Sequence, residues 1–371
     1  MAQSTAVTPG GLVNPEVSRV EPVRAIVSVG LLILTFIVLY GGFVWLRDSN
    51  ASGVPHLVSA IIAIFWGVGG IAALFLVGNY AVESLPGKWT ARIQPFVFIG
   101  PAVILMAWYL AAPALRTFVA SVYDKDGANF IGLQNYSTVF TDRTMIEAWR
   151  NNLLWLAVGT TLTVGMGLAI AVLADRSRFE KVAKSLIFLP MAISMVGAGV
   201  IWKFVFDVNP NIGMVNAAVT GLGGTNQDWL RLVQPWNNLF LIVVMVWLQT
   251  GFSMVLLSAA IKGIPEDLLE AGRIDGASEP LIFFRIIIPN ISTTLITVIT
   301  TTVIFTLKVF DIVQVMTGGN FGTEVIGVRF YREQFTTGNA GLAAAIAIVL
   351  LVAVVPVMVY NLRQFGKRQA F

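Results

Sequence analysis

The residues best suited to chemistry are charged side chains placed in or beside long apolar segments. Lys308 and Asp311 are three residues apart, and Lys203 and Asp207 are four apart, so each pair can share one face of a helix. Ionisable groups in such segments are costly to bury and often line a solute pathway. A paired helix end with a snorkelling lysine is the favoured interpretation for Lys203 and Asp207. For Lys308 and Asp311 the two interpretations are even.

No set of residues points to catalysis. The chain has a single histidine, His56, and no cysteine. It has no G-x-x-x-x-G-K-[ST] loop of the kind that holds nucleotide phosphates, and its carboxylates are not clustered as nucleophilic or metal chemistry requires. We therefore expect no catalytic residue, no metal site and no cofactor. The net charge of +4 is spread over loops, which does not favour nucleic-acid binding.

The composition is that of a membrane protein. Hydrophobic residues make up 56% of the chain and charged residues 12%, whereas a soluble chain carries about twice that share of charge. The apolar blocks reach the roughly 20 residues that a helix needs to cross a bilayer, where the backbone must satisfy its own hydrogen bonds. We predict an all-α polytopic membrane protein with about eight transmembrane helices. They lie near 25–46, 57–82, 95–118, 152–174, 185–206, 237–261, 290–313 and 340–361.

Lysine and arginine predict the orientation, because they are enriched in cytoplasmic loops. They are more frequent in the loops that share a side with both termini, above all in the short loop 175–184. Both termini and the loop 264–289 are therefore expected in the cytoplasm. The longer loops 119–150, 207–236 and 314–339 then lie outside. Their aromatic residues fit either anchors of helix ends or a docking surface for an extracytoplasmic protein.

The loop 264–289 has strong helix signals of its own. Pro265 suits a first helical position, and Glu266 suits the positive end of the helix dipole. Gly276 can adopt the left-handed conformation that ends a helix, and Ser278 can cap a second one. A polar helix–turn–helix between two spans is expected to contact a partner. The simpler alternative is an amphipathic helix that rests on the lipid surface.

This loop resembles the EAA loop of ABC importer permeases. The pattern is carried by Glu270, Ala271, Gly272, Asp275, Gly276, Ala277 and Pro289. Gly272 stands where the family has a second alanine, and Ile288 where it has leucine. The segments Trp247 to Phe252 and Thr317 to Gly319 are similar to the carbohydrate branch of that family, as is the outer segment Gly132-Leu133-Gln134-Asn135-Tyr136.

The resemblance implies a domain organisation. It predicts a type I ABC importer transmembrane domain over 95–362, preceded by two additional N-terminal helices over 25–94. A disordered cytoplasmic tail (1–24) and a basic cytoplasmic tail (363–371) complete the chain. Eight spans are similar to the larger permease subunit of the maltose importer, whose large inserted outer domain has no counterpart here.

The resemblance also implies partners and a mechanism. The EAA loop would sit in a groove of an ATP-binding ABC subunit, which would carry the ATP hydrolysis, so the chain itself is expected not to be an enzyme. A second permease subunit in a heterodimer and an extracytoplasmic sugar-binding protein are the other expected partners. The site of action would be a bacterial-type cell (inner) membrane.

Solute is expected among the spans after residue 184, where the resemblance places it. Sugars need aromatic faces for stacking and polar groups for their hydroxyls. By the family's register, Met191 and Met195 would fall in the site and depart from its usual polar or aromatic residues. The candidates that provide these groups are Trp247, Gln249 and Thr250 on one span, and Thr302, Phe305, Thr306, Lys308 and Asp311 on another.

We therefore predict a permease subunit of a binding-protein-dependent importer for a sugar, such as an oligosaccharide or an α-glucoside. Two alternatives remain. One is a self-contained secondary transporter or channel, which would show internal repeats or broken helices at matching positions. The other is an ABC permease for a solute other than a sugar.

Overall fold

The computed structural model describes residues 22–49, 53–85, 87–175 and 177–366. The ends of the two predicted tails, 1–21 and 367–371, lie outside the described residues. Within them the regular structure is helical, with one isolated β-bridge between Tyr123 and Phe130. The chain forms two compact units, Met1–Ala114 and Leu115–Phe371.

The first unit contains three long apolar helices. They are α1 (Pro22–Asp48), α2 (His56–Glu83) and α3 (Gly87–Met106). Helix α2 packs against both of the others. Its Gly70 is buried, and a Cβ there would lie 2.6 Å from Cδ2 of Leu39 on α1, so this glycine permits close packing. A π-helix, η1 (Ala107–Ala111), continues α3 into α4 (Ala112–Ala120), across the boundary between the units.

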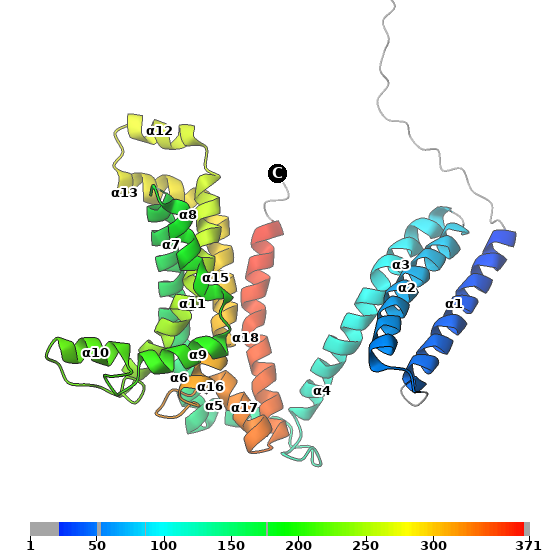
Figure 1. Ribbon diagram of the computed structural model, residues 1–371, viewed down its shortest axis with the longest axis horizontal. Helices are drawn as coiled ribbons and strands as arrows, with labels where there is room; N and C mark the ends of the chain where they lie inside the picture. Colours follow the sequence, from blue (N-terminus) through cyan, green and yellow to red (C-terminus); the bar gives the residue numbers. More distant parts are fainter. Residues whose placement is uncertain (1–21, 50–52, 86, 176, 367–371) are drawn as a thin grey trace, which may run out of the picture. The chain divides into compact units, whose positions relative to one another are not determined.

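The second unit is built around the long helix α11 (Trp236–Lys262), which packs against α7, α8, α9, α15 and α16. A Cβ on Gly251 of α11 would lie 2.6 Å from the carbonyl oxygen of Ile187, so only glycine allows α8 to approach so closely. Figure 1 shows this unit with α12 at one end and α10, α16 and α17 toward the other. The remaining helices are α5 (Gln134–Thr141), α6 (Arg143–Leu154), η2 (Trp155–Thr160), α7 (Thr161–Asp175), α8 (Glu180–Phe188), η3 (Leu189–Ala192), α9 (Met195–Val205), α10 (Met214–Gly221), α12 (Glu266–Ile274), α13 (Glu279–Ile282), η4 (Phe283–Ile287), α14 (Ile288–Asn290), α15 (Ser292–Leu307), α16 (Asp311–Met316), α17 (Ile326–Tyr331), η5 (Arg332–Thr336) and α18 (Ala340–Gly366).

The prediction of about eight spans is confirmed. Among the described residues, six helices are long and apolar enough to cross a membrane, and counting each of two bent helix pairs as one span brings the number up to eight. The bends were not predicted. The fifth span turns by 103° between Ala192 and Met195, and the seventh by 74° between Asn290 and Ser292.

Local chemistry explains the bend in the fifth span. Pro190 lies in the short 3-10 helix η3, and Ile193 is extended with φ −83° and ψ 135°. A new helix then begins at Met195, because the Ser194 side chain caps it by accepting a hydrogen bond from the Gly197 amide at 3.0 Å. The predicted span over 185–206 is therefore not one continuous helix but two helices joined by a bend.

Candidate functional site

The loop after α11 forms the helix–turn–helix that the sequence predicts. Helix α12 begins at Glu266, one residue later than predicted, and Pro265 is its cap. Gly276 has φ +79°. The Ala277 amide donates to the Gly272 carbonyl and the Gly276 amide to the Arg273 carbonyl, both at 3.0 Å, which is the Schellman geometry. The predicted left-handed glycine is confirmed.

One face of α12 packs against the segment that follows it. Gly272 is buried, and a Cβ there would lie 2.8 Å from Cδ1 of Ile286. An alanine at this position, as in the EAA pattern, would require the end of the Ile286 side chain to shift. Leu269 packs in the same cluster, and the Arg273 Nε lies 3.2 Å from the Glu279 Oε1. Helix α12 is thus fastened to α13 and η4.

The other face of α12 is open. Glu270 and Ala271 are exposed, Leu268 is 46% exposed and Ile274 is 84% exposed. Leu268 and Ile274 therefore do not pack with Leu269 in the apolar cluster. The exposed Ile274 side chain is four residues from the exposed Glu270 carboxylate. This combination suits a partner protein that covers both side chains.

The other predicted coupling residues lie around this helix. Asp275, Gly276 and Pro289 are exposed, and Ala277 is half-buried. Together with α12 they form the end of the second unit that lies away from α10 and α16 (Figure 1).

An ionic cluster lies where α7, α8 and α11 end or begin near this loop. Lys184 on α8 donates to Asp175 Oδ1 on α7 and, at 2.7 Å, to Glu180 Oε1. Ser258 on α11 donates to the same Asp175 oxygen at 2.7 Å, and Lys262 pairs with Glu180. The sequence showed Lys184 only as a determinant of topology. Glu180 is four residues from Lys184, a spacing that pairs side chains on one helix face. Asp175 and Ser258 lie 9 and 74 residues away from Lys184, and no helical spacing reveals those contacts.

The predicted solute residues fall into two groups. The hydroxyls of the three threonines are engaged within their own helices. Thr250 donates to the Val246 carbonyl at 2.6 Å, and Thr302 and Thr306 donate to carbonyls four residues earlier, each at 2.8 Å. All three are buried.

The aromatic candidates lie in one cluster. Trp247 and Phe305 are half-buried against the same apolar core as Met195. The ring centroids of Trp247 and Trp202 are 5.6 Å apart, edge to face. Gln249 is half-buried. Trp247, Phe305 and Met195 thus pack against one apolar core.

Neither predicted pair of opposite charges forms. Helix α15 ends at Leu307, and Lys308 lies in the break before α16 begins at Asp311. The helical spacing that would pair them is lost, because Phe310 has φ −145°. Lys203 and Asp207 are likewise without an ion pair within the described residues, because α9 ends at Val205. Both instead line a pocket.

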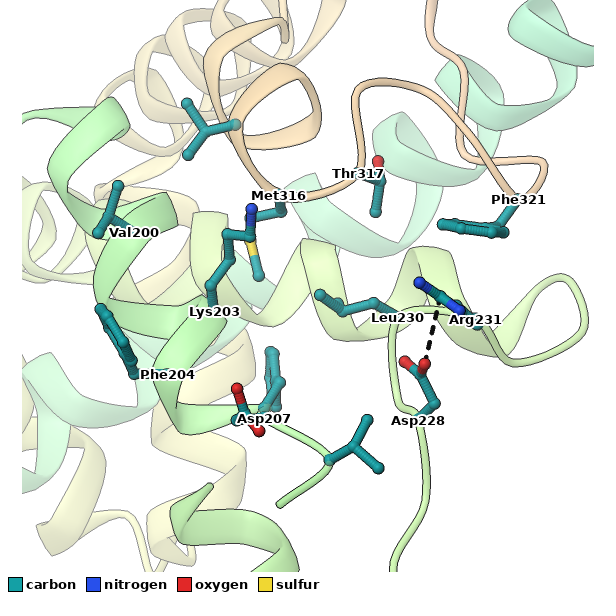
Figure 2. Close-up of a pocket in the computed structure, with 13 residues that line it drawn as sticks. Val200, Lys203, Phe204, Asp207, Asp228, Leu230, Arg231, Met316, Thr317 and Phe321 are labelled. Carbon is teal, nitrogen blue, oxygen red and sulfur yellow. Dashed lines mark ion pairs between the residues drawn. The ribbon is translucent and has the colours of Figure 1, made fainter. Parts of the chain in front are cut away.

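This pocket is a cavity of about 540 Å³ between the end of α9 and the segments 228–231 and 315–321. We call it the outer pocket because its segments belong to the loops that the charge bias predicts outside. Figure 2 shows Lys203 and Asp207 on one side of it and Phe321 on the other. The Arg231 Nε lies 3.3 Å from the Asp228 Oδ2. The Arg231 guanidinium carbon lies 4.9 Å from the centre of the Phe321 ring.

The segment that follows Phe321 in the chain is held by buried ion pairs. Arg332 Nη1 lies 2.8 Å from Glu324 Oε1, and Arg329 Nη2 lies 2.7 Å from Glu333 Oε1. Burial raises the pKa of the Glu324 carboxyl, while Arg332 and Arg329 act in the opposite direction.

Comparison with known proteins identifies the family. Residues 162–365 match the model of the family described as binding-protein-dependent transport system inner membrane component. The chain belongs to this family. The matched residues include α12 and the outer pocket, and membership decides against a self-contained secondary transporter or channel.

Two relatives match most of this chain in sequence. The osmoprotective compounds uptake permease protein GgtC of Synechocystis sp. is 53% identical over 74% of this chain and 99% of its own length. The α-glucoside transport system permease protein AglF of Rhizobium meliloti is 42% identical over 84% of this chain and 97% of its own.

A solved structure confirms the fold. It is a bacterial ABC transporter involved in the import of the acidic polysaccharide alginate, which superposes with a TM-score of 0.64 at 22% identity. The match covers 74% of this chain and 99% of that one. The predicted transmembrane fold of an ABC importer permease is therefore confirmed.

Proposed function

We propose that this permease passes a neutral sugar, such as an oligosaccharide or an α-glucoside, into the cell when a partner ATPase hydrolyses ATP. The similarity to AglF, at 42% identity over 84% of this chain, carries the proposal. The name of GgtC refers to osmoprotective compounds. Neutral sugars such as sucrose are osmolytes themselves, so the two names are compatible.

The coupling step is proposed to act through α12. Its exposed face, with Leu268, Glu270 and Ile274, would enter a groove of the ATP-binding subunit. Movement of that subunit would pass to η4 through the contact of Gly272 with Ile286. Ala271, Asp275, Ala277 and Pro289 belong to the same proposed coupling surface.

The surroundings of the chain follow from this proposal. The α12 side would be cytoplasmic, with both termini on that side, and α10 and the outer pocket would face outward. A second permease subunit and an extracytoplasmic sugar-binding protein would complete the importer. The domain proposal stays as predicted, with two additional helices over 25–94 and the permease domain over 95–362.

Uptake by the assembled transporter tests the solute class. Proteoliposomes that contain the full complex and its binding protein are expected to accumulate radiolabelled trehalose, sucrose or maltose only when ATP is present. Glycine betaine serves as an osmolyte that is not a sugar. Accumulation of betaine without any of the three sugars would contradict the proposal.

Lys308 is the most accessible of the predicted solute residues on its span. It is exposed, whereas the Thr306 hydroxyl is buried and donates to the Thr302 carbonyl. Lys308→Met is therefore expected to raise the half-saturation concentration of uptake by about tenfold, the effect of losing a hydrogen bond from a charged group. Thr306→Val is the matched control and should leave it within about twofold. Unchanged uptake in the lysine variant would remove this residue from the solute pathway.

A further inference from the structure

We propose that the outer pocket is a separate binding subsite for a neutral polyhydroxylated solute, which enters it before it reaches the core of the spans. The inference rests on the proposed function. It adds where the solute first binds and which side chains bind it. It depends on three features: a rigid frame, a strained aromatic residue and a balanced set of charges.

The frame is set by one buried asparagine. Asn216 on α10 is fully buried. Its Nδ2 donates to the carbonyl of Asp207 at 2.7 Å and to that of Gln227 at 2.9 Å, and its Oδ1 accepts from the Gln227 amide at 2.9 Å. A single side chain therefore fixes the two segments that carry Asp207 and Asp228. A pocket whose walls are fixed before binding loses less entropy when a ligand enters.

Phe321 is held in a conformation that a bulky residue avoids. Its φ is +59°, the only positive value at a non-glycine residue in the described part of the chain. Such a conformation persists only where the surroundings enforce it, and it is concentrated at functional sites. Here Asn237 donates to the Phe321 carbonyl at 2.6 Å, and Asn151 donates to the Gly322 carbonyl at 2.8 Å.

The result is an aromatic ring displayed toward the pocket. Phe321 is 50% exposed, although its backbone is fastened by buried amides. Figure 2 shows its ring beside Arg231 at the edge of the cavity. The Arg231 guanidinium lies over one face of this ring, and the part of the ring that stays exposed, next to hydrogen-bonding groups, suits the apolar face of a sugar ring.

The charges of the pocket are balanced. Lys203 and Arg231 face Asp207 and Asp228, so the lining has no net charge to attract an ion. Only Arg231 and Asp228 pair with each other. Lys203 and Asp207 keep donors and acceptors for hydroxyl groups. An anionic sugar would gain no net attraction from this lining, whereas the hydroxyls of a neutral one can donate to Asp207 and accept from Lys203.

The pocket is distinct from the sites predicted within the spans. Thr302 and Thr306 are buried with their hydroxyls engaged, and neither lines the cavity. The cavity volume of about 540 Å³ lies within the range of small-molecule sites. A solute that arrives from the α10 side would meet Phe321 before it meets α15.

Cysteine labelling tests the subsite, because the chain contains no cysteine of its own. Val208 lines the pocket and is 40% exposed, whereas Leu222 lies outside it and is 91% exposed. Val208→Cys and Leu222→Cys are made in the full transporter in proteoliposomes. The rate of reaction with a membrane-impermeant maleimide is then measured with trehalose, sucrose or maltose present.

At least one of these sugars is expected to slow labelling of Val208→Cys by about threefold at twice its dissociation constant, since the unoccupied fraction of sites is 1/(1 + [L]/Kd). Leu222→Cys should label at an unchanged rate, and glucose 6-phosphate should protect neither. Adding Lys203→Met and Asp207→Asn should abolish the protection.

Three results would overturn the subsite: no protection by a sugar that the transporter imports, equal protection at both cysteines, or protection only by sugar-free binding protein. The last would make the pocket a docking surface. Uptake of the same sugars is measured separately. Import without protection therefore removes the subsite alone, whereas absence of sugar import removes the proposed function.

Discussion

Replacing Gly276 by proline is expected to reduce solute uptake by more than about tenfold without preventing membrane insertion, because the left-handed turn that ends α12 is lost. Gly276 has φ +79°, and proline fixes φ near −65°. The substitution also removes the amide that donates to the Arg273 carbonyl at 3.0 Å. Helix α12 would then lose its ending and its position over Ile286. Uptake and ATP hydrolysis by the reconstituted complex measure the effect.

The chain provides a matched control for this substitution. Gly127 also has a positive φ, +71°, and its amide donates to the Asp124 carbonyl at 3.1 Å. Gly127→Pro breaks the same kind of turn in a loop that is not part of α12. If both variants reduced uptake equally, the effect would not be specific to the coupling loop.

A second variant separates coupling from local misfolding. Glu270 is exposed and has no hydrogen bond or ion pair among the described residues, so Glu270→Lys should leave the loop folded. It is expected to weaken copurification of the ATP-binding subunit and to reduce uptake in parallel. Normal transport by Glu270→Lys together with normal transport by Gly276→Pro would disprove the coupling role of α12.

Local signals in the sequence predicted the coupling loop well. Gly276 needs no tertiary information to end a helix, because only glycine adopts this conformation readily. Ser278 likewise lies at the cap of the second helix, although its side chain makes no capping hydrogen bond. The spans were also predictable, since their length and apolarity are properties of continuous segments.

Tertiary features were not predictable in the same way. Lys308 and Asp311 were expected on one helix face, but the chain breaks at Phe310 between α15 and α16. The Asn152 side chain accepts from the Ile326 amide at 2.8 Å, across 174 residues. The outer pocket depends on such amide contacts, which link segments that no short sequence window contains.

The ionic cluster near the coupling loop gives the second large expected effect. The side chain of Lys184 is only 18% exposed and that of Asp175 12%. Removal of one member of such a cluster leaves the other charge without compensation in a poorly solvated place. Lys184→Met is therefore expected to destabilise the permease by about 2 kcal/mol, below the full range for buried pairs because Glu180 remains partly solvated.

Thermal unfolding of the purified complex measures this effect, and a loss of about 3 °C in the Tm of the permease is expected. Lys262→Met is the matched control. It removes another lysine that pairs with Glu180, but the Lys262 side chain is 52% exposed, and exposed ion pairs contribute about 0 to 1 kcal/mol. The control should therefore unfold within about 1 °C of the unmodified complex.

A compensating change tests whether uncompensated charge is the cause. Adding Asp175→Asn to Lys184→Met removes the carboxylate that the lysine neutralised, while the amide oxygen can still accept from Ser258. The double variant should recover about half of the lost stability, because residues in one ionic network are not additive. Equal stability of the two lysine variants, or no recovery in the double variant, would contradict the proposed role. The cluster would then not be what fastens α7, α8 and α11 together beside the coupling loop.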